Sequence, residues 1–257
     1  MPRAAINIDD GTFGGNLLEY NVGFESVLES ADHGWLNLWS REQSVFVRPW
    51  DGTVTPLADW SGARKNFVIA AGGTLSNFDG DDGTRFLWKD HNSHAYAGAK
   101  NFLGHSKRNQ NSIHVMPDLG MMKSTCMFSD GDTDHAGFGE TYVNNTCILL
   151  NRTGAIDSGG CISGNETATS VHSDGNQYYI ADGAAEVQFS CQRHLYDQQE
   201  WANLTGNAQH SNVVVGLPEP EAIALLMQQV VADPDGEMKQ SAGERKQWWQ
   251  DMAIALS

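Results

Sequence analysis

The chain has 257 residues, of which 40% are hydrophobic, and this is enough for one large domain or two smaller ones with a real core. Its formal net charge of −16 argues against nucleic-acid and anionic-membrane partners, because phosphate binding requires clustered Lys and Arg. The 27 glycines, beside only 19% charged residues, are typical of many short strands separated by turns. We therefore expect a mainly β protein.

The chain contains no pattern that predicts targeting or membrane insertion. Its first residues lack a charged segment followed by an apolar stretch, and no later apolar run reaches the roughly 18 residues of a membrane span. We therefore expect no signal peptide, no transmembrane segment and no membrane partner.

The four cysteines are Cys126, Cys147, Cys161 and Cys191. They lack the CxxC spacing of zinc and redox sites. Small buried thiols are favoured over disulfides, and whether any of the four pair stays open.

The first 75 residues contain three strand-like runs, at 35–39, 44–50 and 66–71, separated by turn sequences such as DGT and SGAR. The stretch 16–30 is the one segment there that could form a helix. Residues 76–175 are polar and rich in Gly, Asn, Asp and His, which predicts long loops. Such loops are where an all-β domain usually carries its binding sites.

A strand followed by a short helix is predicted at 186–204. Val187, Phe189 and Cys191 alternate with polar residues, as in a strand with one buried face. Asp197, followed three residues later by Glu200, is a capping-box pattern that predicts the start of a helix.

Two amphipathic helices are predicted at the end of the chain. The first has its apolar stripe at Ile223, Leu226, Met227 and Val230, and the second begins at a capping box formed by Ser241 and Glu244. They form an extension, residues 211–257, that follows a β body at 1–210. The helices either cover an open sheet face or serve assembly through an aromatic and apolar set: Trp248, Trp249, Met252 and Leu256.

The strand-to-helix segment resembles the C-terminal signature of laminin G-like, concanavalin A-like jelly-roll domains. The matching positions are Glu186, Val187, Phe189, Arg193, Leu195, Asp197, Glu200, Trp201 and Leu204. The resemblance implies a jelly-roll-like antiparallel β-sandwich, here with a two-helix C-terminal extension.

A calcium loop is a candidate at 129–140. Asp130, Asp132 and Asp134 occupy alternate positions, and Glu140 follows as a further oxygen ligand. Calcium takes six to eight oxygen ligands in flexible geometry, so this spacing suits it. A second acidic loop, FDGDDG at 78–83, has looser spacing. The alternative is that both are solvated Asp-Gly turns.

Other residue groups give weaker indications of chemistry. His91, His94, His105 and His114 lie close in sequence without metal-site spacing, so we interpret them as loop and surface histidines. Asp-Ser-Gly-Gly, with Ser158 second, resembles the nucleophile segment of trypsin-like serine proteases, but the segment that carries their general base is absent. The sequence therefore predicts no enzyme.

The predicted function is structural. An acidic, Gly-rich β protein with a laminin G-like ending and a helical extension resembles accessory proteins of virus particles, of the decoration, tail or host-attachment type. This implies a location in the virion, with other virion proteins or further copies of the chain as partners. A calcium-assisted carbohydrate-binding module is the first alternative, and a polysaccharide hydrolase is the second.

Overall fold

The computed structural model describes residues 4–8, 14–24, 27, 32–39, 45–56, 59–69, 76–119, 126–130, 139–150, 156–158, 171–181, 188–191 and 194–232. Within these ranges the chain forms three long sheets, a two-stranded hairpin, two α-helices and one 3-10 turn, η1 (Pro117–Leu119).

Successive strands along the chain belong to three sheets in turn, which we call A, B and C. Sheet A consists of β1 (Ile6–Ile8), β4 (Leu36–Leu38), β9 (Ser76–Gly80), β12 (Gly98–Phe102), β15 (Met127–Asp130), β18 (Ile156–Ser158), β21 (Phe189–Cys191) and β22 (His194–Tyr196). Sheet B consists of β2 (Leu17–Glu19), β7 (Ser61–Arg64), β10 (Arg85–Asp90), β13 (His105–Gln110), β16 (Glu140–Val143) and β19 (Val171–Asp174). Sheet C consists of β3 (Val22–Phe24), β8 (Phe67–Ile69), β11 (Ser93–Ala95), β14 (Ile113–Val115), β17 (Thr146–Leu149), β20 (Gln177–Ile180) and β23 (Asn212–Val215).

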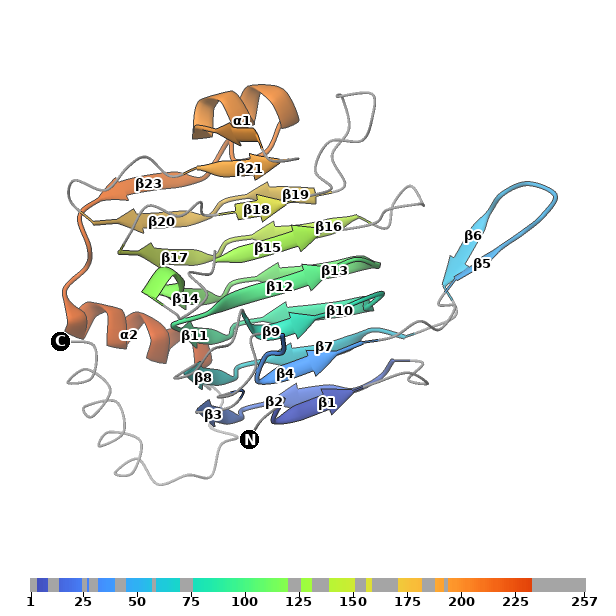
Figure 1. Cartoon of the computed structure of the whole chain (residues 1–257), viewed down its shortest axis with the longest axis horizontal. Coiled ribbons are helices and arrows are strands. Elements are labelled where there is room, and N and C mark those ends of the chain that lie inside the picture. Colours follow the sequence, from blue (N-terminus) through green and yellow to red (C-terminus); the bar gives the residue numbers. More distant parts are fainter. Residues whose placement is uncertain are drawn as a thin grey trace.

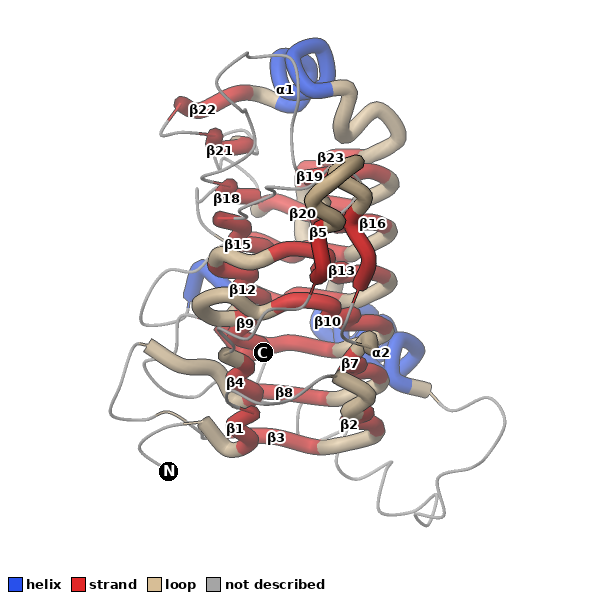
Figure 2. The backbone as a smooth tube through the Cα atoms, turned by 90° about the vertical axis from the view of Figure 1, so that its right-hand side faces the viewer, coloured by secondary structure: helices blue, strands red, loops and turns tan. Residues whose placement is uncertain are grey.

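The chain is a parallel β-helix, in which each coil up to β20 contributes one strand to each sheet, and the last coil contributes β21 and β22 to sheet A and β23 to sheet C. Strands β9, β10 and β11 form one coil, and β12, β13 and β14 form the next coil along the axis (Figures 1 and 2). Neighbours within a sheet are therefore one coil apart and run parallel, as in the register of Arg85 with His105. In the described part of the chain, antiparallel pairing is confined to β21 with β22 and to the hairpin of β5 (Val45–Val47) and β6 (Val54–Pro56).

The predicted jelly-roll-like antiparallel β-sandwich is therefore wrong. The glycine-rich turns and half-buried strands on which it was based are present, but each turn leads to the next face of a coil instead of reversing the strand. The prediction of a possible helix at 16–30 is also wrong for the residues of that stretch that the structure describes. Residues 17–19 and 22–24 are strands, joined by a two-residue turn in which Tyr20 has φ 56°.

A ladder of buried side chains holds the corners between sheets B and C. Each corner has a residue in the left-handed region, at Tyr20, Lys65, His91, Asn111, Asn144 and Gly175. The next residue in each case belongs to the corner ladder, which we define as Asn21, Asn66, Asn92, Ser112, Asn145, Asn176 and Ser211. The side-chain oxygen of each member after the first accepts the backbone N–H of the member one coil earlier. The ladder therefore satisfies buried amides that no strand pairing reaches.

The interior of the coils is packed in columns of equivalent residues. In sheet C, Val68, His94, His114, Cys147 and Tyr178 follow one another in register, and all are buried. Cys147 forms a disulfide with Cys126 inside the coil. The sequence interpretation of buried thiols is therefore wrong for this pair, although both residues are buried as expected.

Two of the predicted helices are present, the first at 198–205 and the second at 220–231. Helix α1 (Gln198–Thr205) starts at a capping box in which Asp197 accepts from the Glu200 backbone and Glu200 accepts from the Asp197 backbone. Helix α2 (Pro220–Val231) buries Ile223 and Met227 against the outer face of sheet C. The Ser93 hydroxyl donates to the Met227 carbonyl, so α2 covers a sheet face. The last predicted helix of the chain lies outside the described residues.

Candidate functional site

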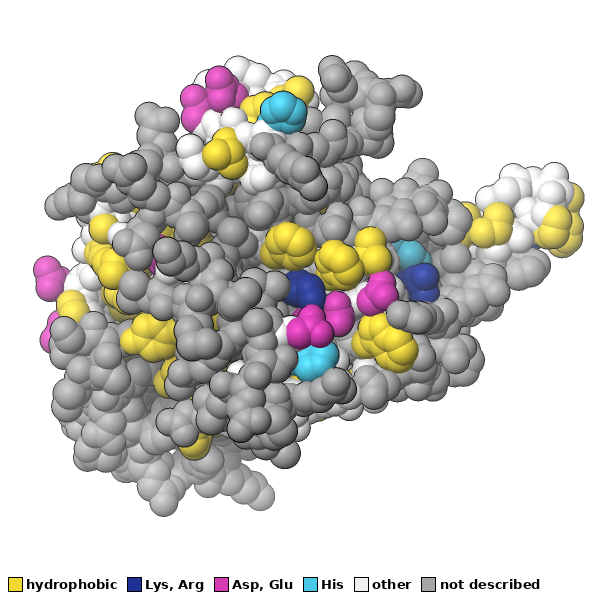
Figure 3. All heavy atoms as spheres, viewed as in Figure 1, with side chains coloured by type: hydrophobic (Ala, Val, Ile, Leu, Met, Phe, Trp, Pro, Cys, Tyr) yellow, Lys and Arg dark blue, Asp and Glu magenta, His cyan; other side chains and the backbone are white. Residues whose placement is uncertain are grey.

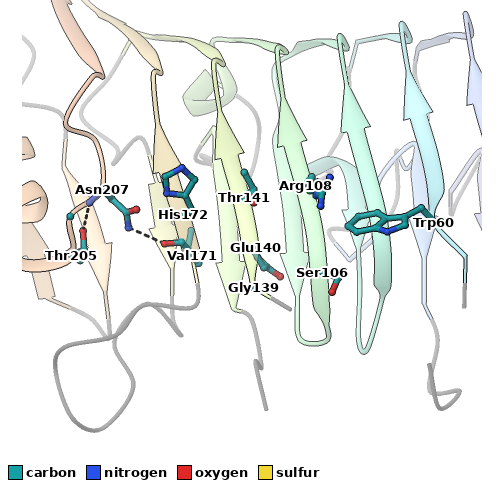
Figure 4. A pocket seen from close by; sticks show the side chains of 11 residues that line it. Trp60, Ser106, Arg108, Gly139, Glu140, Thr141, Val171, His172, Thr205 and Asn207 are labelled. Carbon is teal, nitrogen blue, oxygen red and sulfur yellow. Dashed lines mark hydrogen bonds between the residues drawn. The ribbon is translucent and has the colours of Figure 1, made fainter. Parts of the chain in front are cut away.

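A groove of about 430 Å³ crosses the outer face of sheet B. We call it the sheet B groove, and it is lined by Trp60, Ser106, Arg108, Gly139, Glu140, Thr141, Val171, His172, Thr205, Gly206 and Asn207. Figure 4 shows that these residues follow one another across the strands of sheet B; β13, β16 and β19 contribute directly, and Trp60 reaches the groove from the residue before β7. Trp60 precedes β7 and Asn207 follows α1, so five strand spacings separate the two ends, or roughly 24 Å.

Parallel register places the exposed side chains of the groove in one row. Trp88 is in register with Arg108, Arg108 with Thr141, and Thr141 with His172. Residues in register point to the same face of a parallel sheet, since side chains alternate along every strand. Within the groove the row therefore presents a guanidinium, a hydroxyl and an imidazole at intervals of one strand spacing, and Trp88 continues the row beyond the groove lining.

An arginine guanidinium lies over each of the two tryptophan rings on this face. The Arg108 guanidinium lies over the Trp60 ring at 4.5 Å from its centroid, and the Arg64 guanidinium lies over Trp88 at 5.9 Å. Gly62 supplies the space for Trp88, because a Cβ at Gly62 would lie 2.5 Å from the indole. These contacts fix the rings while each keeps part of its surface accessible.

The C-terminal end of the groove is formed by an ordered polar segment. Asn207 accepts the Ser173 backbone N–H and donates to the Val171 carbonyl, at 3.0 and 2.9 Å. The Thr205 hydroxyl accepts the Asn207 backbone N–H (Figure 4). Beyond the groove on the same sheet, His210 contacts the Asp174 carboxylate at 2.5 Å. Partial burial raises the pKa of Asp174, but the hydrogen bonds from the His210 side chain, the His210 backbone and the Gly175 backbone together lower it more, so this pKa lies below its usual value.

Glu140 reaches the interior instead of the groove. Its carboxylate lies 2.8 Å from the Lys107 ammonium, and both side chains are fully buried. Tyr142 donates to the same carboxylate at 3.3 Å. Of the described residues that line the groove, Glu140 has the one carboxyl group, and that group is engaged in this ion pair.

A second charged cluster lies at sheet A. Lys100 lies 3.0 Å from both Asp79 and Asp81, and burial raises the pKa of Asp79 to about 6 although Lys100 opposes that shift. Asp32 and His33 approach Asp81 to within 4.8 Å. Figure 3 shows acidic, basic and histidine side chains together on the face of the molecule that sheet A forms. The Lys100 ammonium already supplies a cation to the acidic loop at 78–83.

The predicted calcium loop is only partly within the described residues. Asp130 ends β15, whereas Asp132 and Asp134 lie outside the described part of the chain. Glu140 begins β16 and pairs with Lys107. The loop therefore stays a prediction for its three aspartates, and the position of Glu140 does not add to it.

The other candidate residues are dispersed. Trp248, Trp249, Met252 and Leu256, the predicted assembly residues, lie outside the described residues. Ser158 lies at the end of β18. The interpretation of the histidines as loop and surface residues is wrong for His105, which is buried in β13, and for His94 and His114, which stack inside the coils with ring centroids 4.7 Å apart.

Sequence reasoning did not identify Arg108, Thr141 and His172 as neighbours. They are 33 and 31 residues apart in consecutive pairs, and only the coil register brings them together. One signal in the sequence was available, because each lies three residues before an Asn-Ser, Asn-Asn or Gly-Asn step that directly follows its strand.

No family model matches the chain, and neither the curated proteins nor the solved structures contain a match to it. Among the described residues, neither helix has the length and apolar character needed to cross a membrane.

Proposed function

We propose that the protein binds an extended glycan in the sheet B groove. The observation that carries this proposal is the row of Arg108, Thr141 and His172 along a groove that crosses consecutive coils, with the Trp60 ring against Arg108 at one end. An indole offers an apolar face to a sugar ring, and the polar members offer hydrogen bonds to hydroxyl groups. A groove that follows the helix axis suits a chain-like ligand better than a compact one.

The lining favours binding over hydrolysis. Glycosidases act with two carboxyl groups on either side of the scissile bond. The described lining includes one carboxyl group, that of Glu140, and Lys107 holds it inside the coil. Binding without cleavage is therefore the activity that these residues support best.

The net charge and the groove residues favour neutral or acidic glycans over nucleic acid. The whole chain has a formal charge of −16, which repels a polyphosphate. Within the groove, the one fixed charge that faces outward among the described lining residues is the Arg108 guanidinium. A single cation of this kind suits a carboxylate or a hydroxyl cluster on one sugar.

A glycan array probed with the full chain tests this proposal. We expect retention of at least one class of polysaccharide or long oligosaccharide, in EDTA as well as in calcium, because the described groove binds through aromatic, guanidinium and hydroxyl groups. Incubation of the retained glycan should release no reducing ends. An array without any retained glycan would contradict the proposal, and release of reducing ends would favour a hydrolase.

The virion structural role that the sequence predicts stays a prediction. Its assembly residues lie outside the described part of the chain, and attachment to a host through a surface glycan is compatible with the groove. Light scattering on the full chain tests the assembly component independently of glycan binding.

A further inference from the structure

We propose that the side chains of Lys89 and Asn101 form an intramolecular isopeptide bond that joins two consecutive coils. Lys89 lies in β10 of one coil and Asn101 in β12 of the next. Both side chains are fully buried. The bond would form between Lys89 Nζ and Asn101 Cγ, with loss of the side-chain amide as ammonia.

The two reacting groups are already in contact. Lys89 Nζ donates to Asn101 Oδ1 at 2.7 Å and to the Lys100 carbonyl at 3.1 Å. Since a carbonyl bond is about 1.23 Å long, Nζ lies at most about 3.9 Å from Asn101 Cγ, close to the separation of reacting atoms in a near-attack arrangement.

The interior favours the nucleophilic form of the amine. Both described partners of Lys89 Nζ are neutral carbonyl oxygens. Burial, and to a smaller extent the neighbouring Lys107 ammonium, lower the pKa of Lys89 to about 7, against the opposing charges of Glu140 and Asp79. A large share of the molecules therefore has a neutral amine at neutral pH, and a neutral amine is the form that attacks a carbonyl.

Tyr142 lies beside the amide nitrogen that must gain a proton. Asn101 Nδ2 donates to the Tyr142 hydroxyl at 2.7 Å, and that hydroxyl is 3.3 Å from the Glu140 carboxylate. The partners of the Asn101 amide fix its orientation. The Lys89 N–H needs an acceptor, which is Oδ1, and the Tyr142 hydroxyl accepts the N–H of Nδ2.

The step balances without an added reactant. Lys89 Nζ attacks Asn101 Cγ, and a proton moves from Nζ to Nδ2, which lies 2.7 Å from the Tyr142 hydroxyl. The Cγ–Nδ2 bond then breaks, and ammonia departs. The product is an amide that contains the former lysine nitrogen, and no oxidation or reduction takes place.

Mass spectrometry of the full-length protein tests the proposal directly. We expect an intact mass lower than that of the disulfide-bonded sequence by one ammonia. After denaturation, reduction and trypsin digestion, residues 86–100 should be recovered as one branched species with residues 101–107, because a modified Lys89 is not cleaved. Fragmentation should place the branch at Lys89 and Asn101.

Two variants separate the cross-link from other losses of ammonia. Lys89→Met should have the mass of its disulfide-bonded sequence without loss of ammonia. Lys65→Met, which replaces a lysine at a corner between sheets B and C, should keep the branched species. Recovery of peptides 86–89, 90–100 and 101–107 as separate unmodified species from the natural chain would overturn the proposal. Loss of ammonia from the 101–107 peptide alone, with normal cleavage at Lys89, would identify a succinimide at Asn101 and would also overturn it.

Discussion

The side-chain oxygen of Asn92 lies 3.0 Å from both nitrogen atoms of Asn66, its backbone amide and its side-chain amide. The Asn92 amide in turn donates to the Ala63 carbonyl at 2.8 Å. All three groups are buried, so the pair connects two coils at a point where the strands have ended. The same relationship recurs along the corner ladder and explains how short strands with large loops between them keep one register.

Replacement of Asn92 should weaken the whole fold. Asn92→Ala removes the acceptor of two Asn66 N–H groups and the amide that donates to the Ala63 carbonyl, and we expect the free energy of unfolding to fall by about 2–4 kcal/mol. Asn92→Ser should cost less, because Ser112 occupies the equivalent position in the next coil. Urea unfolding measures both. Asn203→Ala, on the exposed face of α1, is the control, and an equal loss there would contradict the ladder.

Two glycines with the same backbone angle separate strain from crowding. Gly104 and Gly206 both have φ 74°, but a Cβ at Gly104 would lie 2.1 Å from the Thr84 carbonyl oxygen, whereas nothing lies within 4 Å at Gly206. Gly206→Ala should cost about 1–2 kcal/mol, from the left-handed conformation alone. Gly104→Ala should cost at least about 2 kcal/mol more, because backbone must move. Thermal unfolding of the two variants provides the comparison, and similar losses would show that the Thr84 contact is relieved cheaply.

Much of the fold was predictable from local signals, and its topology was not. The Asp197 and Glu200 capping box and the apolar stripe of Ile223 and Met227 act within a few residues, so sequence alone predicted α1 and α2. Pairing of strands acts over long separations, and the half-buried strands of a sandwich and of a coil have similar alternation. The left-handed residue and Asn at each corner were the available sign of coils, but they recur at uneven intervals because loops of different length separate them.

The candidate groove was harder to predict than the fold. His172 and Arg108 have ordinary polar surroundings in sequence, and no short motif connects them. Their proximity depends on parallel register across three strands. A prediction of antiparallel sheets placed the binding surface in loops, whereas the groove lies on a sheet face.

The cover that α2 provides should be essential for stability. Ile223 is 2% exposed against sheet C, whereas Leu225 on the same helix is 53% exposed. Ile223→Asp should lower the free energy of unfolding by about 3 kcal/mol or more, because it removes apolar burial and brings a carboxylate into the interface. Leu225→Asp is the matched control and should change stability little. If both variants unfold at the same urea concentration, α2 does not stabilise the coils.

Stability should decline in acid because two stacked histidines are buried in neutral form. Burial lowers the pKa of His114 to about 3, and it lowers the pKa of His94 well below its ordinary value, with His114 and Lys89 as further causes. The unfolded chain takes up these protons below about 6.5 and the folded chain does not, so the stabilisation present above that pH is lost as the pH falls. Asp79, whose pKa is raised to about 6, has the opposite sign, since its contribution falls as pH rises toward 6.

Below the ordinary histidine pKa, each histidine that stays neutral in the folded chain should lower the free energy of unfolding by about 1.4 kcal/mol for every pH unit of acidification. We expect urea unfolding at several pH values between about 4 and 7 to show a net loss of stability toward acid, because two histidines outweigh one aspartate. His114→Leu should reduce the slope, and His194→Leu, at an exposed position, should not. A slope that His114→Leu leaves unchanged would contradict the assignment.

Trp60 should contribute strongly to glycan affinity. Its ring is held by Arg108 at one end of the groove, and its loss removes a stacking surface that a smaller side chain does not replace. Trp60→Ala should weaken binding by about tenfold or more, which corresponds to about 1.4 kcal/mol. Trp50→Ala is the matched control, because Trp50 is 74% exposed in the turn of the β5–β6 hairpin and does not line the groove.

Calorimetric titration of the natural chain with oligosaccharides of increasing length, taken from the glycan class that the array identifies, tests the sheet B groove most directly. The account predicts that affinity rises with length until the oligosaccharide spans the roughly 24 Å from Trp60 to Asn207, and then levels off. It also predicts that Trp60→Ala removes part of that gain while Trp50→Ala keeps all of it. Affinity that is independent of length, or that Trp60→Ala leaves unchanged, would contradict a glycan site on sheet B.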